Sequence, residues 1–261
     1  MLGKVRHCPS PRWALHASAV IAALLSSFHT VVARADVEVE TEAEAAIVAA
    51  TRNDVRVPGD SGTAFSLVDD FSTSASPAFR VRAGVRIAER HLVTALYAPL
   101  TLNATGELDR DLEFEGASFP AGAPLHAVYR FDSYRLTYRY SFVQNASLEL
   151  AAGATAKIRD AEIAVYGPAK GRKTNTGFVP LLNLHAEWRP GAGKLGLLFD
   201  ADALAAPQGR AEDVLLAVLW SARDGVDLYA GYRTLEGGAD NDEVYNFSWF
   251  HYGAVGMRVR L

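Results

Sequence analysis

Alternation of apolar and polar residues is the main pattern of this chain after residue 36. From Ser133 to Phe142, Ser, Arg and Thr at odd positions alternate with Tyr, Leu and Phe at even positions. A period of two residues is that of a β-strand with one apolar and one polar face. The pattern predicts ten strands, approximately over residues 37–51, 79–88, 91–104, 127–143, 147–163, 177–188, 194–205, 213–222, 226–235 and 246–261.

The connections between these segments alternate in length. Residues 89–90, 144–146, 189–193 and 223–225 are short and carry turn residues, whereas 52–78, 105–126, 164–176, 206–212 and 236–245 are mostly longer. Short and long connections in alternation are typical of an outer-membrane barrel, with short periplasmic turns and longer extracellular loops. The fold class that we predict is therefore all-β: an up-and-down antiparallel transmembrane β-barrel of about ten strands with both termini in the periplasm. A soluble barrel or sandwich is the alternative.

Aromatic residues gather near both ends of the predicted strands on the apolar face. One set lies near the short turns and the other near the longer loops, and they comprise Tyr140, Phe142, Trp188 and Trp220, and Phe178, Tyr232, Phe247 and Trp249, respectively. Two aromatic girdles mark the two membrane interfaces of such barrels.

The N-terminus has the pattern of a secretory signal peptide. Basic residues precede an apolar stretch from Trp13 to Leu25, and Ala33 and Ala35 stand at the positions that signal peptidase reads. We predict a signal peptide over residues 1–35 and a barrel over residues 36–261. Cleavage would remove the only cysteine, Cys8, and change the formal charge from −4 to −8. An acidic chain of this kind does not favour nucleic acid as a partner.

The C-terminus resembles that of Gram-negative outer-membrane β-barrel proteins. Val255, Met257, Val259 and Leu261 are apolar in steps of two, like the signal that the barrel-assembly machinery reads, although that family usually ends in Phe. The chain is similar to uncharacterised small barrels, and shares its predicted strand count with the omptin proteases. The resemblance implies secretion through the inner membrane, residence in the outer membrane as a monomer, and contact with lipid, lipopolysaccharide and the assembly machinery.

The polar face of the predicted barrel would line its interior with ten basic and nine acidic residues. Small barrels fill their interior with side chains, and buried charges are normally paired. We therefore expect a charged network that plugs the lumen, with a narrow channel as the alternative. Together with a histidine, its members are Glu38, Glu40, Glu42, Glu44, Arg80, Arg82, Arg86, Arg135, Arg139, Glu149, Lys157, Arg159, His185, Glu187, Asp200, Asp202, Asp227, Arg233, Arg258 and Arg260.

Candidate chemistry is sparse, and we predict no catalytic residue and no cofactor. Omptin-like hydrolysis would need acidic residues and a histidine at the loop ends of the strands. The candidates there are Asp69, Asp70, Asp109, Asp111, His126, Asp240, Asp242 and His251. A lipid-modifying enzyme would need a His-x-Ser pair, which only His16 and Ser18 provide. Asp240, Asp242 and Glu243 form a weak calcium-like cluster or a solvated turn.

The predicted function is that of an integral outer-membrane barrel with a structural, adhesive or small-solute role. A narrow channel for a small or hydrophobic solute is one alternative. An omptin-like or lipid-modifying hydrolase is the other.

Overall fold

The computed structural model describes residues 37–207 and 209–261. The predicted signal peptide, including Ala33 and Ala35, lies outside these residues. In the described ranges, no helix is both long and apolar enough to cross a membrane.

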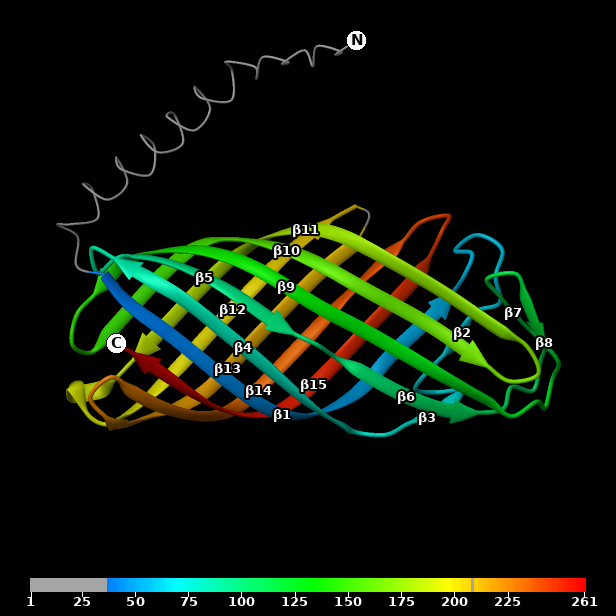
Figure 1. The fold of residues 1–261 in the computed structure, drawn as a ribbon, viewed down its shortest axis with the longest axis horizontal. Helices are drawn as coiled ribbons and strands as arrows, with labels where there is room; N and C mark the ends of the chain where they lie inside the picture. Colours follow the sequence, from blue (N-terminus) through cyan, green and yellow to red (C-terminus); the bar gives the residue numbers. More distant parts are fainter. Residues whose placement is uncertain (1–36, 208) are drawn as a thin grey trace, which may run out of the picture. The chain divides into compact units, whose positions relative to one another are not determined.

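The chain folds into a closed antiparallel barrel of ten strands, as predicted (Figure 1). Each strand pairs with its neighbours in sequence, and the first pairs with the last. The strands around the barrel are β1 (Val37–Arg56), β4 (Ser76–Ile87), β5 (His91–Ala98) continued by β6 (Thr101–Gly106), β9 (Leu125–Gln144), β10 (Leu148–Tyr166), β11 (Lys170–Trp188), β12 (Leu195–Ala206), β13 (Gly209–Arg223), β14 (Val226–Asp240) and β15 (Tyr245–Arg260).

The seam between β1 and β15 closes the barrel and brings acidic residues of the first strand opposite basic residues of the last. Glu40 lies opposite Arg260 and Glu42 opposite Arg258. The N–H groups of Val39 and Leu261 each donate to the carbonyl oxygen of the other, at 2.9 Å. Complementary charges therefore face each other across the two terminal strands.

Tight turns join the strands at the end of the barrel that carries the seam termini, which we call the turn end. Ala88 and Glu89 both have positive φ, and Gly225 has φ of 73° next to Asp224. Positive φ is the geometry of two-residue hairpins that match the strand twist. A 3₁₀ turn, η1 (Pro190–Ala192), connects β11 to β12.

The opposite end, which we call the loop end, differs from the prediction at three connections. Residues 164–176, 206–212 and 236–245 were expected to be mostly loop, but β10 to β15 continue through most of them. The pairing of β10 with β11 runs to Tyr166 opposite Lys170. These extensions lack a regular alternation: Ala164 and Val165 are consecutive buried apolar residues, and residues 170–176 contain no large apolar side chain. The backbone ladder therefore continues where the pattern that predicts a strand is lost.

The two long connections carry short strands of their own. Residues 57–75 contain β2 (Phe65–Ser66) and β3 (Phe71–Thr73), which pair with β1 and β6. Residues 107–124 contain a hairpin of β7 (Leu112–Phe114) and β8 (Ala117–Phe119). Glu115 and Gly116, both with positive φ, form its turn.

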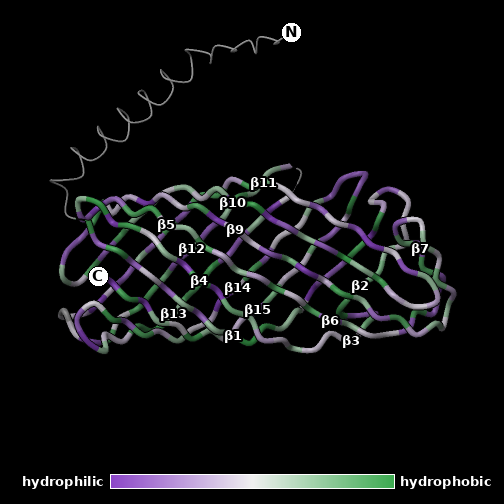
Figure 2. Tube along the Cα trace, viewed as in Figure 1, coloured by the Kyte–Doolittle hydropathy of each residue, from purple (hydrophilic) through white to green (hydrophobic). Residues whose placement is uncertain are grey.

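The two faces of the barrel wall follow the predicted parity, and Figure 2 shows polar and apolar residues alternating along the strands. Leu136, Leu182 and Val218 point outward and are more than half exposed, whereas their neighbours Thr137 and Asn183 are buried inside. Trp188 and Trp220 lie outward near the turn end, and Phe178 and Tyr232 lie outward nearer the loop end. The aromatic residues thus border an outward apolar band.

The barrel interior is divided into two layers. The half toward the turn end contains the buried charged side chains and a small apolar cluster beside them, made of Leu198, Leu215, Ala217, Leu219 and Tyr229. The half toward the loop end is apolar, and there residues of the two long connections pack against the strands. Phe65 packs edge-on against Phe114 with ring centroids 5.8 Å apart, and Phe114 and Phe119 have no exposed surface.

Candidate functional site

The charged layer is built from inward positions of most of the strands, because every second residue of a strand points into the barrel. All but a few of the predicted lumen residues are buried there and contact an opposite charge. The network is organised around a few carboxylates that each receive several guanidinium groups. Such sharing compensates buried charge, which is costly when it stands alone.

Asp213 is the most heavily shared of these carboxylates. Its Oδ2 accepts from Arg80 Nη1 at 3.0 Å and from Arg135 Nη2 at 2.5 Å. Its Oδ1 accepts from Arg233 Nη1 at 2.6 Å, and Arg233 in turn holds both carboxylate oxygens of Glu44 at 2.7 and 3.0 Å. Asp213 therefore joins its own strand, β13, to β4, β9 and β14 through one side chain.

A second centre forms around Asp200 and Asp202 on β12. Asp200 Oδ2 accepts from Arg139 Nη2 at 2.7 Å and lies 3.4 Å from Arg82 Nη1 and 3.2 Å from His185 Nδ1. Asp202 binds Arg135 at 2.8 Å. The His–Asp pair is enclosed by this network, and His185 belongs to the polar core rather than to an accessible site.

A third group of ion pairs lies at the turn end of the lumen. Glu187 accepts from Arg258 at 2.8 Å, and Arg258 lies 3.5 Å from Glu42 and 3.7 Å from Glu40. Arg260 lies 3.2 Å from the carboxylate of Asp227. The other pairs of this group link Arg86 with Glu40 and Glu149, and Arg189 with Glu187 and Asp227.

Three predicted members stand apart from the ion-pair network. Among the described residues, Glu38, Lys157 and Arg159 form no ion pair. Lys157 is buried, and its ammonium lies 4.8 Å from the centroid of the Phe131 ring. Arg159 contacts the side-chain oxygen of Asn175 through Nη2. Lys157 and Arg159 lie above the charged layer, toward the loop end.

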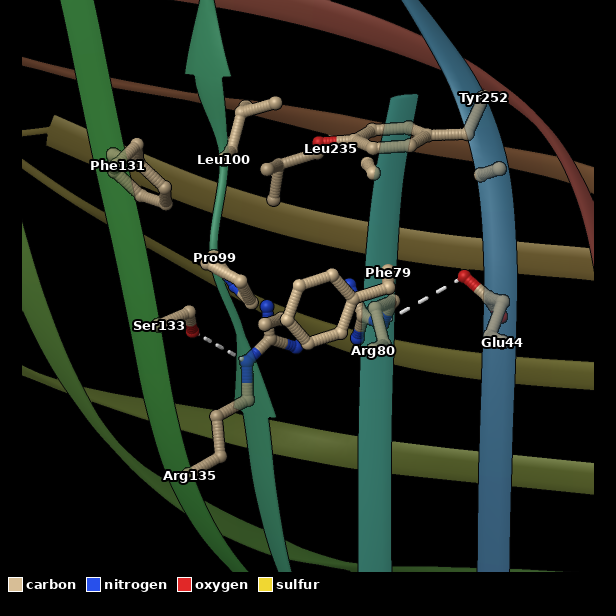
Figure 3. A pocket seen from close by; sticks show the side chains of 13 residues that line it. Glu44, Phe79, Arg80, Pro99, Leu100, Phe131, Ser133, Arg135, Leu235 and Tyr252 are labelled. Carbon is tan, nitrogen blue, oxygen red and sulfur yellow. Dashed lines mark hydrogen bonds and ion pairs between the residues drawn. The ribbon is translucent and has the colours of Figure 1, made fainter. Parts of the chain in front are cut away.

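The two layers meet at a small cavity of about 10 Å³, which is the size of one water (Figure 3). Arg80 and Arg135 approach it from below, and Leu100, Leu235 and Tyr252 lie above. Arg135 donates to Ser133 at 3.0 Å, whereas Arg80 Nη2 is buried without a hydrogen-bond partner.

A larger cavity of about 380 Å³ lies in the wall near the loop end. Lys157, Arg159, Phe131 and Phe250 contribute to it from inside the barrel, and Phe178 comes from β11. This volume is within the range of about 300–1,000 Å³ found for small-molecule sites. It is the best candidate for a ligand site among the described residues.

The acidic residues and histidines considered for hydrolysis do not converge. His126 stacks on Tyr166, and His251 Nε2 hydrogen-bonds Thr51 at 2.7 Å on the outer face. Asp70 and Asp111 accept backbone N–H groups from Ser66 and Ala121. In the described ranges, the structure brings none of Asp69, Asp109, Asp240 and Asp242 into contact with a histidine.

The weak calcium cluster forms a turn. Asn241 Oδ1 accepts the backbone N–H groups of Glu243 and Val244, both at 3.0 Å. No group of three or more His, Cys, Asp or Glu side chains suited to a metal ion is found in the described part of the chain, Asp240, Asp242 and Glu243 included.

The sequence prediction missed several residues of the network. Asp213 begins the predicted segment 213–222, whose inward residues Leu215, Ala217 and Leu219 are apolar like its outward ones, so neither face of that segment is polar. Counting back in twos from Leu219 would have placed Asp213 inside. Tyr229 donates to Glu44 at 2.9 Å and lies over Gly256, where a Cβ atom would meet its ring at 2.2 Å.

Comparison with protein-family models and with curated proteins found no match. Among solved structures, the chain is similar to the outer membrane protease OmpT from Escherichia coli, with a TM-score of 0.54 and 7% identity over 86% of this chain and 97% of that one. The chain has the fold of an outer-membrane β-barrel. At this identity the likeness concerns the fold alone.

Two other barrels align over most of their length with lower scores. They are the transport unit of the autotransporter AIDA-I from Escherichia coli and the attachment invasion locus protein Ail of Yersinia pestis. The AIDA-I unit has a TM-score of 0.41 and 8% identity over 85% of this chain and 89% of that one. Ail has a TM-score of 0.37 and 9% identity over 85% of this chain and 99% of that one.

Proposed function

We propose that the protein is an integral outer-membrane barrel that conducts no solute and has a structural or solute-binding role at the cell surface. The observation that carries this proposal is the outward apolar band, which ends sharply at a belt of charge. Beyond Ile158 the next two outward positions of β10 are ion-paired, and beyond Phe178 two threonines precede an ion-paired arginine on β11. The ion-paired residues of this belt are Arg130, Asp132, Asp160, Glu162 and Arg172.

This belt suits the outer boundary of a membrane. Arg130 donates to Asp160 at 2.9 Å, and Arg172 donates to Glu162 at 2.6 Å. These hydrogen bonds lower the pKa of both carboxyls, so the belt stays ionised at neutral pH. Charged groups of this kind are stable in a headgroup layer and costly in hydrocarbon. Outer-membrane lipid is therefore the partner that the apolar band implies.

The packing of the interior supports a role other than transport through the barrel. Toward the turn end the ion pairs span the lumen, and toward the loop end the apolar layer includes Phe114 and Phe119, which have no exposed surface. A hydrated pore would require the ion pairs of the charged layer to break and the packed side chains of the apolar layer to move apart. For this reason we favour a closed barrel over the alternative of a narrow channel, and the arrangement of the rim histidines gives no support to a hydrolase.

Arginine substitutions on the outer face test the membrane placement. Leu136→Arg places a charge in the apolar band and is expected to cost about 2–4 kcal/mol of folding free energy in lipid vesicles. Thr174→Arg, also outward but beyond Phe178, is the matched control and is expected to cost about 0–1 kcal/mol. Urea unfolding followed by tryptophan fluorescence measures both. Equal costs would show that the band does not lie in the bilayer.

Planar-bilayer recording tests the closed lumen. The folded protein is expected to produce no discrete conductance steps, because both layers of the interior are filled. A porin reconstituted in the same way verifies that insertion is detected, and the gel shift of unheated samples verifies folding. Reproducible steps from the wild-type barrel would establish the narrow channel instead.

A further inference from the structure

The barrel wall has a notch between β11 and β12. These strands pair only from Leu182 to Trp188, opposite residues 197–203, whereas β11 pairs with β10 over its full length. β12 continues to pair with β13 as far as Ala206 opposite Gly209. In the described residues, the edge of β11 above Leu182 has no ladder to β12.

Pro180 supplies a local cause for this notch. It stands two residues beyond the last pair of the ladder, Leu182 with Ala203. Proline has no backbone N–H to donate to a neighbouring strand, and in sheets it is confined to strand edges and bulges. Because Phe178 belongs to the aromatic border, the notch lies at the level of the outer membrane surface in the proposed orientation.

The 380 Å³ cavity lies directly behind the notch. Its walls include Pro180 of β11 and Leu204 of β12, one on each side, together with Phe131, Leu235 and Phe250 from within the barrel. It is therefore a largely apolar chamber with a lateral opening, and its polar residues include Asn246, Ser248 and the ion-paired Arg210 and Glu236. A ligand could reach this chamber from the outer leaflet without passing through the lumen.

Two cationic side chains of the chamber, Lys157 and Arg159, have no acidic partner for their positive charge among the described residues. Lys157 is 3% exposed and, among the described residues, has no ion pair or hydrogen bond; its ammonium faces the Phe131 ring. The acidic residue that lines the chamber, Glu236, is paired with Arg210, and Asp213 is already held by three arginines. Arg159 contacts Asn175 through Nη2, but its Nε is buried without a hydrogen-bond partner. A buried cation of this kind is stabilised by an anion.

We propose that this chamber binds the anionic headgroup of a single-chain amphiphile. The headgroup pairs with Lys157 and Arg159, and the chain lies along Phe131, Leu235 and Phe250 and leaves through the notch beside Pro180. A volume near the lower end of the range for ligand sites suits one acyl chain rather than the several chains of a membrane lipid. The inference rests on the proposed membrane placement, because only then does the notch open toward lipid.

Displacement of a fluorescent fatty acid, 11-(dansylamino)undecanoic acid, tests the site in the folded barrel in neutral detergent. Laurate is expected to displace the probe, with dodecyl phosphate as a second arm that distinguishes a carboxylate from a phosphate headgroup. Dodecanol, which has the same chain and no charge, is expected to bind at least tenfold more weakly than laurate. No displacement by either anion, or equal displacement by dodecanol, would overturn the proposal.

Lys157→Met tests the headgroup assignment, with Lys194→Met at the exposed turn before β12 as the matched control. The first variant is expected to bind laurate at least tenfold more weakly and to bind dodecanol as the wild type does, whereas the control binds both unchanged. The unheated gel shift verifies that each variant is folded. Unchanged laurate affinity in Lys157→Met would place the headgroup elsewhere and overturn the assignment.

A cross-link across the notch tests the route. Continuing the register past Leu182 brings Pro180 level with Ala205, so a flexible bis-maleimide joining Pro180→Cys to Ala205→Cys would bridge the opening. The cross-linked fraction is expected to take up the probe at least tenfold more slowly than the same variant blocked with N-ethylmaleimide. Equal rates would exclude the notch as the route. If Leu136→Arg and Thr174→Arg cost the same while laurate still binds at Lys157, the membrane placement is overturned and the binding site is not.

Discussion

Asp213→Asn is expected to lower the unfolding free energy of the barrel by about 3–5 kcal/mol, the range for removing one partner of a buried ion pair. Asp213 is the shared acceptor of Arg80, Arg135 and Arg233, and all four side chains are buried. The amide keeps the size of the carboxylate but loses its charge. Three guanidinium groups then repel each other in a space where water does not screen them.

The measurement is the urea midpoint in lipid vesicles, followed by tryptophan fluorescence. Asp109→Asn is the matched control: its carboxylate pairs with Arg110 at 3.2 Å but is 93% exposed, and a change within about 0.5 kcal/mol is expected. The double variant Asp213→Asn, Arg80→Met should recover part of the loss, because Arg80 Nη2 already lacks a partner. If Asp213→Asn shifts the urea midpoint no more than the control does, the ion pairs of Asp213 do not hold the strands together.

Much of this architecture follows from period-two patterning alone. A strand in a barrel has only two faces, so the parity of Leu136 and Arg135 fixes which side each side chain takes, and the strand count follows from the number of such segments. The pairing of the first strand with the last was predictable for the same reason, because an even number of strands brings the two ends of a closed barrel together. The register that places Glu42 opposite Arg258 is known only from the structure. The periodic part of the fold is thus encoded locally.

What could not be predicted depends on contacts between distant segments. Phe65 and Phe114 belong to two irregular connections whose lengths say nothing about whether they fold inward. The isolation of Lys157 is visible only once the partners of Asp213 are known. Pro180 could have signalled a weakened ladder, but the strand that it fails to pair with is identified only by the closed barrel.

The apolar layer near the loop end predicts a local response to mutation. Phe114→Ala removes a ring that packs edge-on against Phe65 and approaches the backbone at Gly171. Truncating a fully buried Phe costs about 3–5 kcal/mol. Because Phe114 belongs to the β7–β8 hairpin and not to the barrel wall, we expect most of this cost to appear as opening of the hairpin while the barrel stays folded.

Trypsin cleavage after Arg110, just before that hairpin, measures the opening. The cleavage rate of Phe114→Ala is expected to rise at least a hundredfold, since about 1.4 kcal/mol changes an opening equilibrium tenfold and cleavage follows the open population. Glu113→Ala, whose side chain is exposed on the same short strand, is expected to leave the rate unchanged. The unheated gel shift should persist in both variants. Loss of that shift in Phe114→Ala would show that the apolar layer supports the whole barrel, because the hairpin could not then open independently of the ion-paired layer beneath it.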